Sequence, residues 1–180
     1  MKLSPSDLYA LVNVKKNLDA KFLINYVGQN PEETEALLNI ALSTEPLPSR
    51  NAGYVLSLIA EKDRKLILPF VKVICKVIPD LKHNSQIYCL IMCLVNAEPE
   101  IDQLDNLLDF LFQSMELSSD YGSVKYAAIT YLDKLCEQEP LLVNEFVETL
   151  SYYTPRFEKK YLIEQAKKLH SKWSPLVSKA

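Results

Sequence analysis

Seven carboxylates gathered in one region are the side chains of this sequence best placed to do chemistry. Residues 83–124 contain no Lys or Arg, and the acidic residues among them are Glu98, Glu100, Asp102, Asp105, Asp109, Glu116 and Asp120. On a helix over residues 99–116, steps of three and four residues would align five of these along one flank: Glu98, Asp102, Asp105, Asp109 and Glu116. We assign four of them to a candidate partner-binding surface, the acidic row: Glu98, Asp102, Asp105 and Asp109.

The acidic row admits three interpretations. The plainest is a solvated helix face, because charged side chains are seldom buried. A second is a docking surface for a basic protein segment, since like charges repeated at helical spacing cost stability on their own. A divalent-cation site is the weakest, because hard cations take six or more converging oxygens and one helical row offers two at best. We therefore predict no bound metal and keep the basic protein segment as the functional hypothesis.

The cysteines could do different chemistry, because Cys89 and Cys93 share a helix face at a spacing that suits two zinc ligands. Their surroundings, IYCLIMCLV, are those of a buried core instead. No CxxC or HxxxH pattern accompanies them, and His83 and His170 are isolated in the sequence. We predict buried thiols that act as small hydrophobic groups, with no metal and no cofactor. Such thiols favour a reducing compartment.

The three glycines, Gly28, Gly53 and Gly122, are too few for a loop that cradles phosphate. The sequence contains neither GxxxxGK[ST] nor GxGxxG, and GxSxG is absent too. These absences argue against nucleotide-binding α/β folds and α/β-hydrolases. We predict a protein that is not an enzyme, without catalytic residues.

The ten tyrosines leave two interpretations open. They could form a binding strip, or they could bridge helix interfaces with the ring buried and the hydroxyl in water. Seven of them are Tyr54, Tyr88, Tyr126, Tyr131, Tyr152, Tyr153 and Tyr161. The pair Tyr152-Tyr153, between the last two predicted helices, completes the candidate partner-binding set.

A repeated turn organises the chain and recurs at intervals of 33, 35 and 41 residues. Its four copies are Asn30-Pro31, Asp63-Arg64, Glu98-Pro99 and Glu139-Pro140. Intervals near this length are typical of stacked helical hairpins. Each copy predicts the end of one helix and the start of the next, with Asn30 and Asp63 as N-caps. Glu45-Pro46 falls after a second helix, and we interpret it as an ordinary loop.

These turns divide the chain into helices. The first helices of the pairs are predicted at residues 18–28, 49–61, 84–96 and 122–137, and their partners at 31–43, 64–78, 99–116 and 140–152. A last helix covers 155–172, and a short one covers 5–16. One hairpin buries too little apolar surface alone, so neighbours must stack to build a core. Residues 1–180 are therefore predicted to form a single all-α domain, a right-handed α-α superhelix of about four hairpins with a terminal capping helix.

These helix-turn-helix units, with acids in their turns, resemble the HEAT-like branch of the armadillo superfamily over most of the chain. The stretch RNAGYVLSLIAEKDRKLILPFV, residues 50–71, is also similar to a group of short uncharacterised bacterial helical proteins that sometimes carry the name adenylosuccinate lyase. That activity does not follow, because those lyases are several-fold longer and have a Ser- and Gly-rich loop. Here the one Ser-Ser pair, Ser118-Ser119, precedes Asp120-Tyr121-Gly122 instead.

The resemblance implies a non-catalytic scaffold that binds a protein partner on its concave face, lined by the second helix of each pair. Some HEAT-like proteins are instead DNA glycosylases with a basic concave groove, so an alkylpurine glycosylase-like DNA-repair protein is the alternative. Cations do gather near the end of the chain, where they form either a solvated capping helix or a patch for nucleic acid or an acidic partner: Arg156, Lys159, Lys160, Lys167, Lys168, Lys172 and Lys179. The net charge of -3 and the pI of about 5.5 favour the protein partner over nucleic acid.

The location and assembly are predicted from weaker signals. The beginning, MKLSPSDLYAL, breaks after one apolar residue at Pro5, so we expect no secretory signal. The longest apolar stretch, residues 66–78, is too short to span a bilayer and carries Lys72 and Lys76. We expect a cytoplasmic protein that is a monomer or a weak dimer.

Overall fold

Helices make up the regular structure of the computed structural model, which describes residues 3–104 and 106–177. The α-helices of these residues are α1 (Pro5–Val12), α2 (Ala20–Gln29), α3 (Glu33–Ala41), α4 (Pro46–Lys62), α5 (Val71–Val77), α6 (Asn84–Ala97), α7 (Leu107–Gln113), α8 (Gly122–Gln138), α9 (Leu142–Tyr153) and α10 (Lys160–Trp173). Their 3-10 turns are η1 (Arg64–Leu66), η2 (Leu68–Phe70), η3 (Ile78–Asp80), η4 (Ile101–Gln103), η5 (Ser114–Glu116), η6 (Ser119–Tyr121), η7 (Thr154–Arg156) and η8 (Ser174–Leu176). The predicted all-α class is confirmed.

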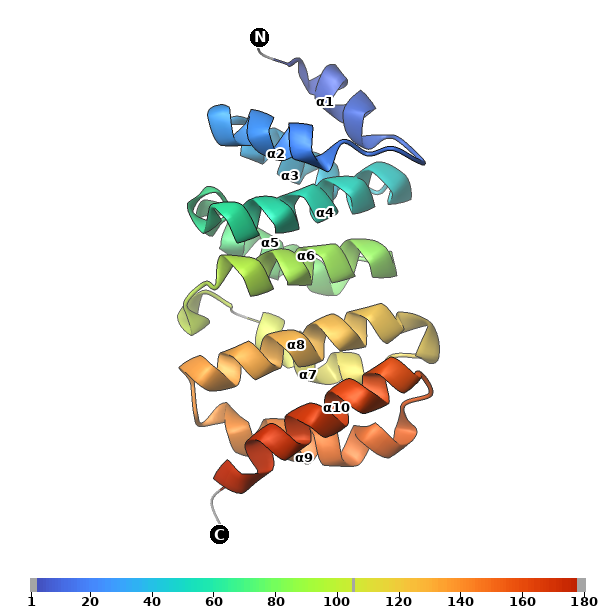
Figure 1. Ribbon diagram of the computed structural model, residues 1–180, viewed down its shortest axis with the longest axis vertical. Coiled ribbons are helices and arrows are strands. Elements are labelled where there is room, and N and C mark those ends of the chain that lie inside the picture. The colour runs from blue at the N-terminus through green and yellow to red at the C-terminus, as the bar shows by residue number, and fades with distance from the viewer. Residues whose placement is uncertain (1–2, 105, 178–180) are drawn as a thin grey trace.

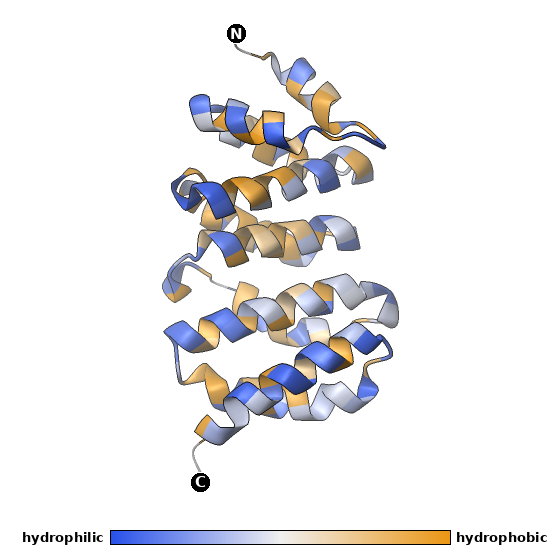
Figure 2. Ribbon diagram, viewed as in Figure 1, coloured by the Kyte–Doolittle hydropathy of each residue, from blue (hydrophilic) through white to orange (hydrophobic). Residues whose placement is uncertain are grey.

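The helices stack in two layers, which Figure 1 shows one behind the other. Helices α2, α4, α6, α8 and α10 lie side by side in the front layer, and α3, α5, α7 and α9 lie in the back layer. Successive hairpins follow one another down the long axis, which confirms the predicted α-α superhelix. Figure 2 shows hydrophobic and hydrophilic residues side by side along each long helix, as stacking against two neighbours requires.

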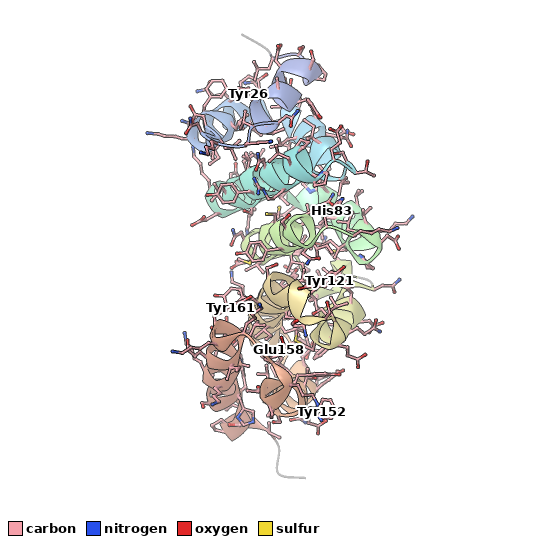
Figure 3. The ribbon with its side chains drawn as sticks, turned by 90° about the vertical axis from the view of Figure 1, so that its right-hand side faces the viewer. Tyr26, His83, Tyr121, Tyr152, Glu158 and Tyr161 are labelled. Atoms are coloured by element: carbon pink, nitrogen blue, oxygen red, sulfur yellow. The ribbon has the colours of Figure 1, made fainter. Side chains whose placement is uncertain are left out.

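The stack is shallowly bowed when it is seen from the side in Figure 3. Helices α2 and α10 project further from the stack than α4, α6 and α8 between them, so the front layer lines the concave face. The expectation that the second helix of each pair lines this face is therefore wrong. Closer spacing in the front layer explains the curvature. A Cβ on Gly53 of α4 would lie only 3.0 Å from the Cys89 Cβ of α6, whereas α5 and α7 behind them leave an open groove.

Proline and polar side chains fix several helix ends. Glu45-Pro46 is not an ordinary loop, because Pro46 occupies the first position of α4, where the missing N–H of proline costs nothing. Asp63 caps a helical turn as predicted, since its carboxylate accepts a hydrogen bond from the Lys65 N–H at 3.1 Å. The prediction that Asn30 begins α3 is wrong. Its side-chain amide donates to the Tyr26 carbonyl at 2.8 Å and ends α2 instead.

Two back-layer helices predicted to be continuous are broken in the structure. Residues 64–78 form η1, η2, α5 and the start of η3, because Pro69 and Pro79 have no N–H to donate and clash with the preceding turn. Residues 99–116 contain η4, α7 and η5, so the single helix expected there is wrong. Glu98 precedes them in a left-handed backbone conformation, with φ at 48°, that ends α6.

Buried polar side chains hold the front layer against the ends of other helices. Asn51 of α4 donates to two carbonyls at and beyond the end of α1, at 2.8 and 2.9 Å. Gln86 of α6 donates to two carbonyls at and beyond the end of α3, at 2.7 and 3.0 Å. Lys125 of α8 donates to the Met115 carbonyl at 3.0 Å. Each bond satisfies a carbonyl that a helix end leaves without an intrahelical partner.

Candidate functional site

Four tyrosines on successive front-layer helices reach solvent on the concave face. Tyr54 of α4 and Tyr161 of α10 are each 46% exposed, while Tyr88 of α6 and Tyr126 of α8 are half-buried. They stand 34, 38 and 35 residues apart, close to the interval of the repeat. Each is exposed or partly buried in a helix whose other apolar side chains are mostly buried. These four residues are here named the tyrosine row.

Contacts between neighbours join the tyrosine row. The rings of Tyr126 and Tyr161 meet edge to face, with centroids 6.0 Å apart. The Tyr161 hydroxyl would lie 2.6 Å from a Cβ on Gly122, so a glycine at the start of α8 admits this ring. Burial raises the pKa of Tyr88, and its neighbours Cys89 and Tyr126 add to that shift. A direct ring contact therefore joins the members of the row on α8 and α10.

The centre of the tyrosine row is uncharged and amphipathic. Four residues after each tyrosine, on the same stripe, stand the partly buried side chains Leu58, Met92, Thr130 and Gln165. Tyrosine and methionine are enriched where proteins bind one another, because they offer large contact areas at a small cost in conformational entropy. The concave face can thus bury apolar groups of a partner and satisfy polar ones through its hydroxyls.

A polar edge borders the row at the carboxyl ends of the front-layer helices. There one side chain of each helix bonds to the helix before it in the layer, and a cation is held in three of the four links. The links are Lys62 to Asn25 (3.0 Å), Asn96 to the Ser57 carbonyl (2.9 Å), Lys134 to Glu98 (2.7 Å) and Lys172 to Asp133 (2.8 Å). These three lysines thus form hydrogen bonds between adjacent helices of the front layer.

The acidic row is divided among separate elements. Glu98 lies at the end of α6, where a hydrogen bond from Lys134 lowers the pKa of its carboxyl and Arg64 lies 3.6 Å away. Asp102 is exposed on η4, and Asp109 is exposed on α7. Asp105 lies outside the described residues. The expected single flank of one helix is therefore wrong, because the helix that would carry it is broken before Leu107.

Asp109 lines a groove of about 750 Å³ between α5 and α7 on the convex face. Lys72 and Lys76 of α5 line the same groove. A basic segment bound there would meet these two cations beside the carboxylates of Asp80 and Asp109. The groove is thus of mixed charge, unlike the purely acidic surface that the sequence suggested.

Tyr152 and Tyr153 end α9, on a different part of the molecule from the tyrosine row. Their rings meet edge to face at 4.8 Å, and Tyr152 is 54% exposed with the Arg156 guanidinium 3.6 Å above its ring. The Tyr153 hydroxyl donates to the Glu116 carboxylate at 2.7 Å. Figure 3 labels Tyr152 at the lower end of the stack. This pair is available to a partner, but it stands apart from the acidic row residues Asp102 and Asp109.

The thiols sit in the core. All four cysteines are buried, and burial raises the pKa of Cys89 to about 11 and that of Cys136 to about 12. Residues 3–104 and 106–177 contain no group of three His, Cys, Asp or Glu side chains that could hold a metal ion. In the same part of the chain, no helix has the length and hydropathy that a membrane span requires.

The sequence names the tyrosines of the row but leaves their role open, because the outward stripe of a helix is known only once its neighbours are placed. Lys125 was not predicted as a site residue, although it is a cation inside the apolar stretch SVKYAAI and is only 8% exposed. A charged residue on the buried stripe of an amphipathic helix is the signal that could have singled it out.

The comparison with known proteins agrees with the two-layered stack. No curated protein matches the sequence. The family model described as HEAT repeat domain matches residues 9–170, which is nearly the whole length of the helical array. HEAT repeats commonly mediate protein–protein interaction. The chain belongs to the HEAT repeat domain family.

Proposed function

We propose that this protein is a non-catalytic binding module that holds a segment of a partner protein on its concave face, across the tyrosine row. The observation that carries this proposal is the placement of half-exposed tyrosines on α4, α6, α8 and α10, on a face that no other part of the described chain covers. A regular array of such rings presents a strip that one extended or helical segment can follow.

The energetics of aromatic side chains support this choice of surface. Tyrosine residues recur among the few side chains that dominate binding energy at protein interfaces, and they act best where neighbours exclude water. Here Leu58 and Met92 lie beside Tyr54 and Tyr88 and supply that apolar surrounding. The polar edge then frames the strip with hydrogen-bonding groups.

The alternative of a DNA-binding or DNA-repair protein finds less support. A nucleic-acid groove needs free cations for phosphates. On the concave face, Lys134 and Lys172 are paired with Glu98 and Asp133 of this same chain. Binding of a basic segment by the acidic row likewise loses support, because Lys72 and Lys76 share the groove of Asp109.

Photo-crosslinking can test the concave face directly. We would replace Tyr88 with a photoreactive phenylalanine derivative and, as the matched control, replace Phe110 of the convex groove in the same way. A partner should crosslink from position 88 and not from position 110. In parallel, Tyr88→Ala should weaken the affinity for the captured partner about tenfold or more, as is usual for an aromatic anchor, whereas Tyr152→Ala should not.

The opposite pattern would refute the proposal. If position 110 crosslinks and Tyr152→Ala weakens capture while Tyr88→Ala does not, the partner binds the convex side or the end of α9. If the captured ligand is DNA and its affinity falls steeply with salt, the DNA-binding alternative replaces the protein-binding one.

A further inference from the structure

A pocket of about 280 Å³ lies where the connection from α7 to α8 meets the connection from α9 to α10. Figure 3 faces this side of the molecule, and Glu158 of the second connection is labelled there. The pocket has no part in the tyrosine row. Its polar groups include one that the helical stack does not fully satisfy, the ammonium of Lys125.

Lys125 is a buried cation with an incomplete set of partners. Its side chain is only 8% exposed, and its ammonium donates one hydrogen bond, to the Met115 carbonyl at 3.0 Å. An ammonium has three N–H donors. In the part of the chain that the structure describes, no carboxylate forms an ion pair with it, and the centroid of the Phe157 ring lies 5.5 Å from Nζ.

Burial of a charge in this way is costly unless acceptors compensate for the lost water. Burial accordingly lowers the pKa of Lys125, and the carboxylate of Glu158 offsets that shift in part. A methionine would fill the same space without this cost, but it would leave the Met115 carbonyl without its hydrogen bond. That single bond accounts for one of the three donors of the ammonium and leaves two for a ligand.

Two of the charged groups of the pocket already have partners. The Glu116 carboxylate accepts a hydrogen bond from Tyr153, and the Arg156 guanidinium donates to the Tyr152 carbonyl. Three cations and two carboxylates line the pocket in all: Lys125, Arg156, Lys159, Glu116 and Glu158. The balance of charge is positive, and Lys125 is the buried group among these five, whereas the other four are exposed.

We propose that this pocket binds a small anion, a carboxylate or phosphate group, through the two free N–H donors of Lys125. The volume suits a ligand of a few heavy atoms, at the lower end of small-molecule sites. The anion would complete the hydrogen bonds of the ammonium, while Lys159 at the pocket adds favourable charge. Charge-assisted hydrogen bonds of this kind are among the strongest that proteins make.

An NMR titration of the full chain tests this inference. Inorganic phosphate, acetate and succinate are added separately at constant ionic strength, and the amide signals of Ser118, Ser119 and Lys125 are followed. We expect saturable shifts confined to these residues and their neighbours, and the anion that saturates at the lowest concentration distinguishes phosphate from carboxylate. Lys125→Met should bind at least about tenfold more weakly, because it loses the charge-assisted bonds.

Matched variants make the result decisive. Lys76→Met removes an exposed cation of the convex groove and should bind the anion as the unmodified chain does, and Tyr88→Ala should as well. Shifts that do not saturate, that gather around Lys72 and Lys76, or that persist in Lys125→Met would overturn the proposal. If Lys125→Met fails to fold, the map of shifts in the unmodified chain decides alone, since the site must appear in it. Failure here would leave the concave-face proposal untouched.

Discussion

The front and back layers of the stack are built from the same chain but differ in regularity. Helices α4, α6 and α8 of the front layer run unbroken for 17, 14 and 17 residues. In the back layer, α5 and α7 have 7 residues each and continue only through 3-10 turns. The long helices of the front layer thus keep side chains at the same position of each repeat in line. The short helices of the back layer do not.

The difference follows from where prolines and polar groups stand. Front-layer prolines such as Pro46 and Pro48 lie in the first turn of α4, where no intrahelical N–H bond is lost. Back-layer Pro69 and Pro79 interrupt their helices. A helix broken in this way turns its side chains to new directions, so residues spaced by three and four no longer share a flank. A further break separates η4 from α7, where no proline stands, and it is this break that divides the acidic row. Helices α4, α6 and α8, which carry Tyr54, Tyr88 and Tyr126, have no such break.

The largest effect should come from truncating the core of the front layer. Leu94 of α6 is fully buried, so Leu94→Ala should lower the free energy of unfolding by about 2–5 kcal/mol. Leu108→Ala in the back-layer helix α7, where the side chain is only partly buried, should cost about half of that or less. Urea unfolding monitored by circular dichroism measures both. Equal losses would show that the two layers contribute alike to the core.

A second test concerns the close spacing within the front layer. Gly53→Val should lower the free energy of unfolding by about 1–3 kcal/mol, because its Cβ would press on Cys89 and force α4 and α6 apart. The matched control is Gly28→Ala in α2, where nothing lies within 4 Å of the new Cβ. That change should raise stability by about 0.5–1 kcal/mol, since alanine favours the helix. If both substitutions are neutral, close spacing does not cause the curvature.

Much of the fold was predictable because the repeat and the apolar stripes are local signals. The four first helices were placed within a few residues of α2, α4, α6 and α8, since each ends at a turn pair such as Asp63-Arg64 or Glu139-Pro140. The breaks in the back layer were not predicted, although Pro69 and Pro79 were visible. Apolar residues can keep a helical spacing even where the backbone hydrogen bonds of the helix are interrupted. The spacing alone therefore predicts a helix that is too long.

The candidate site was less predictable, because it depends on contacts between distant residues. The sequence shows tyrosines at the interval of the repeat, but which of them face solvent depends on how neighbouring helices pack. Tyr131 illustrates this: it lies on the same helix as Tyr126, yet it is 1% exposed within the core. For Lys125, the sequence can show a charge on the buried stripe of its helix, but its contact with the Met115 carbonyl depends on how α8 packs.

The smallest effect should come from the link between α6 and α8 at the polar edge. Glu98 has its pKa lowered by Lys134, so its ionised form is stabilised in the folded state. The contribution is fully present above the unfolded pKa, near 4.5, and is lost as pH falls through the lower folded value. Glu98→Gln should therefore cost about 0.2–1 kcal/mol at pH 7, the usual range for an exposed pair, and progressively less below pH 4.5.

The matched control for this link is Glu145→Gln, on the back-layer helix α9, where no ion pair is recorded within the described residues. Its effect on the free energy of unfolding at pH 7 should be smaller. Urea midpoints at pH 7 and pH 3 for both variants give the comparison. A Glu98→Gln effect that stays constant with pH would mean that the glutamate acts through its left-handed backbone position rather than through its charge. In that case the Glu98–Lys134 ion pair would not stabilise the front layer, and the two layers would differ only in the regularity of their helices.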